Sequence, residues 1–140
     1  NAEVYGNLYN WYAVDDERGV CPEGFHVPTD DDWTSVTNYL GGASVAGGKL
    51  KEEGTEHWYS PNSATNESGF TALPGGSCSG DDCTNLGKKT FYWSATGTLG
   101  NAKLRYLNYD NSMIDSLNQS ELLISNLSLY PGLSVRCVAD

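Results

Sequence analysis

The sequence is short of positive charge. Its 140 residues contain only eight lysines and arginines against 18 aspartates and glutamates, and the formal net charge is −10. Nucleic acid and anionic membrane surfaces are bound by clustered Lys and Arg, so neither is an expected partner. An acidic surface is common in extracellular proteins, where it favours solubility. It is also compatible with a specific use of cations.

Long hydrophobic runs are also missing. No segment approaches the roughly 20 apolar residues that span a bilayer, so membrane insertion is not expected. The first residues lack the pattern of a signal peptide, which predicts a mature chain or a piece of a longer protein. Asn1 begins no recognisable helix or strand, so we expect an upstream segment. The length predicts a single domain over residues 1–140.

Tyrosine, tryptophan and glycine are abundant instead. The chain has nine Tyr, four Trp and 16 Gly. This composition is typical of a fold with many short strands and long ordered loops, and it argues against a helix bundle.

The four cysteines predict disulfide bonds and a secreted protein. Of the three possible pairings we favour Cys78 with Cys83, which enclose only a polar turn, and hence Cys21 with Cys137. The second bond would clamp the two ends of the domain together. The alternative is a metal site. Cys-x4-Cys is a poor zinc motif, however, and neither a Cys-x2-Cys nor a closely spaced His pair completes it.

Two helices are predicted in the first half of the chain. The first begins after Thr29, with Asp32 placed for a capping box, and its apolar stripe consists of Trp33, Val36 and Leu40. Gly41 and Gly42 end this helix. The second helix is expected over Ala43–Glu52, although two glycines weaken it.

Short strands account for the other regular structure. A strand is expected to begin at Tyr5, and Trp11–Val14 is either its continuation or the first turn of a helix. Further strands are predicted at 25–27 (short and buried), 92–96, 102–108, 113–117 and 133–138. Residues 54–76 have the chemistry of loops with aromatic anchors. The apolar segment 121–129 is interpreted as an insertion of variable length.

Several ordered motifs make the chain resemble a known bacterial family. They include Tyr5–Val14, Cys21–Thr29, Ala46–Lys51, Asn66–Phe70, Ala72–Gly76, Tyr92–Thr96 and Ser134–Val138. Together they resemble the Fibrobacter succinogenes major paralogous domain, which occurs in bacterial surface and secreted proteins. The family normally has further strands before Tyr5, so the resemblance implies that upstream strands are missing here.

The resemblance implies a fold as well. The family is similar to the formylglycine-generating enzymes, a branch of the C-type lectin-like fold. The expectation is therefore an α+β domain with two helices, a twisted antiparallel sheet, long irregular loops and stabilising disulfides. In that fold the two termini meet in one sheet, which is consistent with a bond between Cys21 and Cys137.

Catalytic chemistry is not predicted. His26 lies in an apolar context and is interpreted as a buried structural residue, and His57, beside Trp58, as a packed loop anchor. No Ser-His-Asp motif is recognisable. Formylglycine-generating enzymes use a reactive cysteine pair, and no matching pair occurs here. An oxidase of that kind remains a third hypothesis, which requires a free thiol.

The Glu-Pro-Asn, Gln-Pro-Asp and Trp-Asn-Asp motifs of calcium-dependent lectins are absent, and Ser60-Pro61-Asn62 matches only in part. Four aromatic residues could still stack on sugars if exposed, although core positions are commoner: Trp58, Tyr59, Tyr92 and Trp93. Hard oxygen ligands at 62–67 and 79–82 make a Ca²⁺ ion possible, without the spacing of an EF-hand.

Three positions fit the acceptor pattern for N-glycosylation: Asn66, Asn118 and Asn126. Such sites are usually unused in bacterial proteins.

These observations lead to one functional hypothesis and one alternative. The hypothesis is a non-enzymatic recognition or adhesion module, secreted or on the bacterial cell surface, that binds a carbohydrate or protein. The loop face between Gly54 and Lys89 would bind it, with these best candidates: Trp58, Tyr59, Asn62, Asp81 and Asp82. The alternative is a structural subunit of an extracellular filament or surface layer. Missing upstream strands would leave a sheet edge open to a neighbouring chain.

Overall fold

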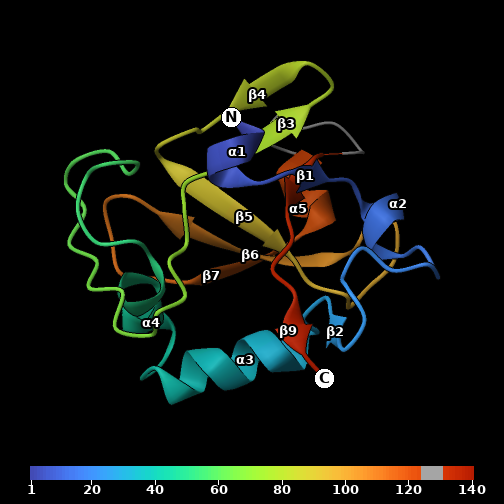
Figure 1. Cartoon of the computed structure of the whole chain (residues 1–140), viewed down its shortest axis with the longest axis horizontal. Helices are drawn as coiled ribbons and strands as arrows, with labels where there is room; N and C mark the ends of the chain where they lie inside the picture. Colours follow the sequence, from blue (N-terminus) through green and yellow to red (C-terminus); the bar gives the residue numbers. More distant parts are fainter. Residues whose placement is uncertain (124–130) are drawn as a thin grey trace.

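The computed structural model describes residues 1–123 and 131–140 and has a mixed α+β architecture (Figure 1). Its helices are α1 (Ala2–Tyr5), α2 (Trp11–Val14), α3 (Asp30–Tyr39), α4 (Ala43–Leu50) and α5 (Gln119–Leu123). Its strands are β1 (Leu8–Tyr9), β2 (Phe25–His26), β3 (Ser77–Ser79), β4 (Asp82–Thr84), β5 (Lys89–Trp93), β6 (Lys103–Asn108), β7 (Asp115–Asn118), β8 (Leu133–Ser134) and β9 (Val138–Ala139). None of the helices described is long and apolar enough to cross a membrane.

The two longer helices lie close to their predicted positions. At the start of α3 the predicted capping box is present: Thr29 Oγ1 accepts a hydrogen bond from the Asp32 N–H, and Asp32 accepts one from the Thr29 N–H. Helix α4 ends at Leu50, two residues before the predicted end. Lys51 has already adopted an extended backbone there and forms a bridge with Ala72.

The central sheet has five strands in the order β1-β8-β5-β6-β7. Strand β5 pairs antiparallel with β6 and parallel with β8, so the C-terminal segment lies between the first strand and the middle of the chain. Because successive side chains of a strand point to opposite faces, Tyr92 packs with Trp33 in one core cluster, and Phe91 and Trp93 pack in the other. The sheet therefore has a hydrophobic core on each face.

Close backbone packing joins α4 to the segment before β7. A Cβ built at Gly47 would lie 2.0 Å from the backbone oxygen of Met113, and the Gly48 N–H donates to Ser112 O. Glycine at position 47 therefore permits an approach that no side chain would allow.

Several boundaries differ from those predicted. Residues 2–5 form a helical turn, and the strand begins only at Leu8; Trp11–Val14 is helical, which was one of the two alternatives.

The closing strand predicted at 133–138 is divided into β8, in the large sheet, and β9, which pairs with β2. In β2, Phe25 is 47% exposed, so the prediction of a buried strand was wrong there. The predicted insertion begins inside α5, and residues 124–130 lie outside the described part.

Both predicted disulfides are present. Cys21 bonds to Cys137 and Cys78 to Cys83. Cys78 and Cys83 face each other across the β3–β4 hairpin, where the sequence had predicted only a turn. In Figure 1 this hairpin lies at the opposite end of the molecule from α3 and from the β2–β9 pair.

Candidate functional site

The loop face predicted to bind a ligand connects α4 to β5 and is mostly irregular. Trp58 is the main anchor of this segment. Its side chain is 1% exposed, and its indole Nε1 donates to Ala72 O at 2.9 Å. The ring therefore lies in the core, so the exposed position considered for Trp58 is wrong, whereas ligand binding by Trp58 stays a prediction. Tyr92 and Trp93, 7% and 0% exposed, are also core residues.

Tyr59 is the predicted aromatic binding residue that reaches solvent. Its side chain is 54% exposed, and its backbone N–H donates to Gly87 O at 2.8 Å. The ring of Tyr109 stands edge-on at 6.4 Å, and Lys88 Nζ lies 5.5 Å from the Tyr59 ring centroid. This hydrogen bond and the two ring contacts hold an aromatic face at the surface. We call Tyr59, Tyr109 and Lys88 the tyrosine patch.

Asn62 shapes the loop from within. Its amide Nδ2 donates to the carbonyls of Glu52 at 2.8 Å and Gly54 at 2.7 Å, and its Oδ1 accepts from the Ala64 N–H. The amide is therefore engaged in holding residues 52–64 together. Binding of a ligand by Asn62 stays a prediction.

Asp81 and Asp82 lie elsewhere, at the exposed tip of the β3–β4 hairpin. Among the described residues, no hydrogen bond, ion pair or ring contact joins them to Tyr59 or Asn62. The structure thus places the five predicted residues in three settings: core, loop and hairpin tip.

A group that sequence reasoning missed surrounds His57. The His57 Nδ1 lies 2.9 and 3.0 Å from the two carboxylate oxygens of Glu52, and Glu56 is close by. One ligand atom from each of the three residues lies within 4.8 Å of the others. The ring of Tyr5 stands edge-on to His57 at 5.7 Å. The sequence signal was the spacing Glu52-x3-Glu56-His57, which is informative only once the loop conformation is known.

His26 joins the C-terminal residue to α3. Its Nδ1 lies 2.8 Å from an Asp140 carboxylate oxygen, and its Nε2 lies 3.0 Å from one of Asp32. These two carboxylates, Asp32 first, raise the pKa of His26. The His26 side chain is 40% exposed, so the prediction of a buried histidine is wrong. Its contacts with Asp140 and Asp32 are made at the surface.

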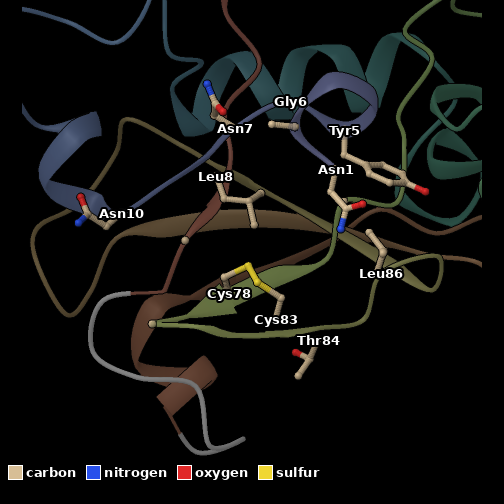
Figure 2. A pocket seen from close by; sticks show the side chains of 14 residues that line it. Asn1, Tyr5, Gly6, Asn7, Leu8, Asn10, Cys78, Cys83, Thr84 and Leu86 are labelled. Carbon is tan, nitrogen blue, oxygen red and sulfur yellow. A yellow bond between two sulfur atoms is a disulfide. The ribbon is translucent and has the colours of Figure 1, made fainter.

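A hollow lies elsewhere, beside β1. It has a volume of about 720 Å³ and lies between residues 1–10 and the β3–β4 hairpin. Figure 2 shows side chains of both segments around it, including Tyr5, Leu8, Leu86 and the Cys78–Cys83 disulfide. Among the described residues, its lining contains no Asp, Glu, Lys, Arg or His. The lining residues described therefore offer shape and hydrogen-bonding groups.

The predicted glycosylation positions have different settings. The Asn66 amide donates to Thr71 Oγ1 at 2.9 Å and accepts from the Thr71 N–H. Asn118 is half-buried at the end of β7, and Asn126 lies outside the described residues. Use of these sites stays a prediction.

The profile of the Fibrobacter succinogenes major domain matches residues 1–139. The chain belongs to this family. No curated protein and no solved structure matches it in the two other comparisons. Membership of the Fibrobacter succinogenes major domain family does not by itself assign a ligand or an activity.

Proposed function

We propose that this domain is a non-enzymatic recognition module that binds carbohydrate at the bacterial cell surface, for adhesion. We further propose that its architecture is C-type lectin-like. Three features support that architecture: two main helices, β1 and β8 from opposite ends of the chain paired in one sheet, and long loops between α4 and β5. Two disulfides support a secreted or surface location, because such bonds persist in oxidising compartments.

The tyrosine patch carries the proposal. Trp58, Tyr92 and Trp93, the other aromatic residues considered for sugar binding, are buried, but Tyr59 is more than half exposed. An aromatic face offers an apolar platform with a polar hydroxyl, which suits sugars with one apolar face. Loops held by a rigid scaffold are a common location for binding residues. Lys88 adds a cation beside the ring, so a sugar with a carboxylate is a favoured ligand.

The cysteines support a role other than thiol oxidation. All four are paired, so chemistry of the formylglycine-generating type would first need a disulfide to be reduced. A titration of free thiols under denaturing conditions tests this alternative, and finding about two thiols per chain would revive it.

A glycan array with the intact domain is the direct test. The array is probed with and without Ca²⁺, and hits are measured in solution with Tyr59→Ala. We expect this substitution to weaken binding about tenfold, which equals about 1.4 kcal/mol. The matched control is Tyr39→Ala, because Tyr39 is 88% exposed but lies on α3, outside the tyrosine patch.

The proposal fails if no glycan binds, or if Tyr39→Ala weakens binding as much as Tyr59→Ala does. If the domain binds only a protein, and Tyr59→Ala abolishes that binding, the tyrosine patch remains the binding surface. The proposal of a carbohydrate ligand is then overturned. Dependence on Ca²⁺ would revive the prediction of a calcium ion at the loop face.

The edge strand β1 supports a second candidate, a structural subunit assembled by strand pairing. In the described structure β1 is one of the two outer strands of the large sheet, and the hollow of about 720 Å³ lies beside it. An unpaired strand edge can accept a strand from a neighbouring chain. Negative-stain electron microscopy and sedimentation over a range of concentrations test this. Ordered filaments would favour the subunit, and a monomer at all concentrations would exclude it.

A further inference from the structure

The two histidines of the chain are each bracketed by carboxylates, but in different ways. At His26 the two carboxylates approach different ring nitrogens, Asp140 at Nδ1 and Asp32 at Nε2. The two nitrogens of an imidazole point in diverging directions, so one ion cannot contact His26 and both aspartates. At His57 the Glu52 carboxylate faces a single nitrogen, Nδ1, with both of its oxygens.

Around His57 the donor atoms converge. One atom from each of Glu52, Glu56 and His57 lies within 4.8 Å of the other two. Imidazole nitrogens and carboxylate oxygens are both zinc ligands, and zinc sites with three protein ligands keep a fourth position open. Imidazole favours zinc and similar first-row metals over calcium, which prefers six to eight oxygens.

The loop fixes the positions of Glu52 and His57, whereas Glu56 is exposed. The Glu52 N–H donates to Ala72 O at 3.1 Å, and the Glu52 carbonyl accepts from Asn62. His57 directly precedes the buried Trp58, whose indole is hydrogen-bonded to Ala72. Glu56 is exposed, so its side chain can move the short distance needed to close around an ion.

The charge balance favours a cation at this place. Glu52 pairs with His57, and in the described ranges neither Glu52 nor Glu56 forms an ion pair with Lys or Arg. Two carboxylates therefore share one imidazole in a chain whose net charge is −10. A divalent ion would neutralise both carboxylates and attach to the same imidazole nitrogen.

We propose that Glu52, Glu56 and His57 form a binding site for one divalent transition-metal ion of the zinc class. On binding, the ion takes the place of the hydrogen bond between His57 Nδ1 and the Glu52 carboxylate. Three protein ligands leave a fourth coordination position for water. The inference concerns the ion itself and does not rest on carbohydrate binding.

The test is calorimetric titration of the disulfide-intact domain with ZnCl₂ in a non-chelating buffer. We expect one ion per chain. Glu56→Gln should weaken binding about tenfold or more, and this exposed position should leave folding unchanged. His57→Gln should remove binding. The matched control is His26→Gln, which changes the other bracketed histidine and should leave the affinity unchanged.

A second measurement identifies the ligands directly. In proton–nitrogen NMR spectra of the two imidazoles, ZnCl₂ should shift the ring signals of His57 and leave those of His26 in place. Millimolar Ca²⁺ should not displace the zinc. The proposal is overturned if no zinc binds, if Glu56→Gln and His57→Gln bind as well as the native chain, or if the His26 signals shift instead. If the domain binds zinc but no glycan, only the proposed carbohydrate-binding function is rejected, and the metal site stands.

Discussion

At the scale of single residues, the ammonium group of Lys51 organises the turn between β6 and β7. Its Nζ donates to the carbonyls of Asn108 at 2.6 Å and Asn111 at 2.8 Å, and the residue is 1% exposed. The Trp58 ring centroid lies 5.1 Å away. Burial lowers the pKa of Lys51 to about 8, against the opposing effect of Asp110, so the group is still mainly charged at neutral pH.

Lys51→Met tests this arrangement. The substitution keeps much of the apolar stem but leaves buried carbonyl groups without their donor. We expect the free energy of unfolding to fall by about 2–4 kcal/mol, because an unsatisfied buried polar group costs about 1–3 kcal/mol. Guanidinium unfolding without reductant measures it.

Lys49→Met is the control for this experiment. Lys49 is two residues away, with a side chain that is 33% exposed and an Nζ 3.8 Å from Glu67. A partly exposed pair at that distance contributes little, so we expect a change within about 0.5 kcal/mol. Equal effects of the two substitutions would contradict the role given to Lys51.

At the scale of elements, His26 ties three of them together. It lies in β2, which pairs with β9, and its two ring nitrogens reach Asp140 after β9 and Asp32 in the first turn of α3. Only a protonated imidazole donates from both nitrogens, whereas the neutral ring has one N–H. The junction of β2, β9 and α3 should therefore depend on pH.

The sign of that dependence follows from the raised pKa of His26, caused first by Asp32 and then by Asp140. The stabilisation is fully present below the ordinary value of 6.5 and is lost as pH rises through the higher folded value. We therefore expect the thermal midpoint to fall over this window. Differential scanning calorimetry of the native chain and of His26→Gln measures it, and the variant should lose this part of the dependence.

Asp140→Asn serves as an intermediate case. It removes one of the two carboxylates that face His26 but keeps Asp32, so the folded pKa of His26 is raised less. The fall with pH should therefore be smaller and should end at a lower pH. A native profile that is flat above pH 6.5, or one that His26→Gln leaves unchanged, would refute the proposed dependence.

At the scale of the whole molecule, the two disulfides constrain very different lengths of chain. The Cys21–Cys137 bond joins residues 116 positions apart, and the Cys78–Cys83 bond joins residues five apart. In the chain-entropy model a cross-link stabilises by restricting the unfolded chain, and its effect grows with loop length. The long-range bond should therefore dominate stability, and the hairpin bond should act locally.

Replacing each pair by serine separates the two effects. Removing Cys21 and Cys137 together should lower the free energy of unfolding by about 5 kcal/mol, and removing Cys78 and Cys83 by about 2 kcal/mol. Denaturant unfolding in the absence of reductant provides both values. A larger loss from the hairpin pair would show that local strain or packing, and not chain entropy, decides the result.

The sequence by itself determined the features that depend on near neighbours. The start of α3 was predictable because Thr29 and Asp32 cap each other within one helical turn. The Cys78–Cys83 pairing followed from a short polar turn, and the other pairing followed by elimination. The family was recognisable from ordered motifs along the chain, and its profile matches residues 1–139.

Only the tertiary structure decided what depends on distant contacts. Trp58 and Tyr59 are adjacent aromatic residues with opposite exposure. The Trp58 indole donates to Ala72 O in the core, whereas the Tyr59 backbone N–H donates to Gly87 O and the Tyr59 ring lies at the surface. The division of the C-terminal segment into β8 and β9 required two partners from far earlier in the chain. The cluster around His57 likewise exists because a folded loop brings Glu52 back to it. Sequence patterns specify local hydrogen bonds, whereas exposure and donor convergence depend on how the whole chain packs.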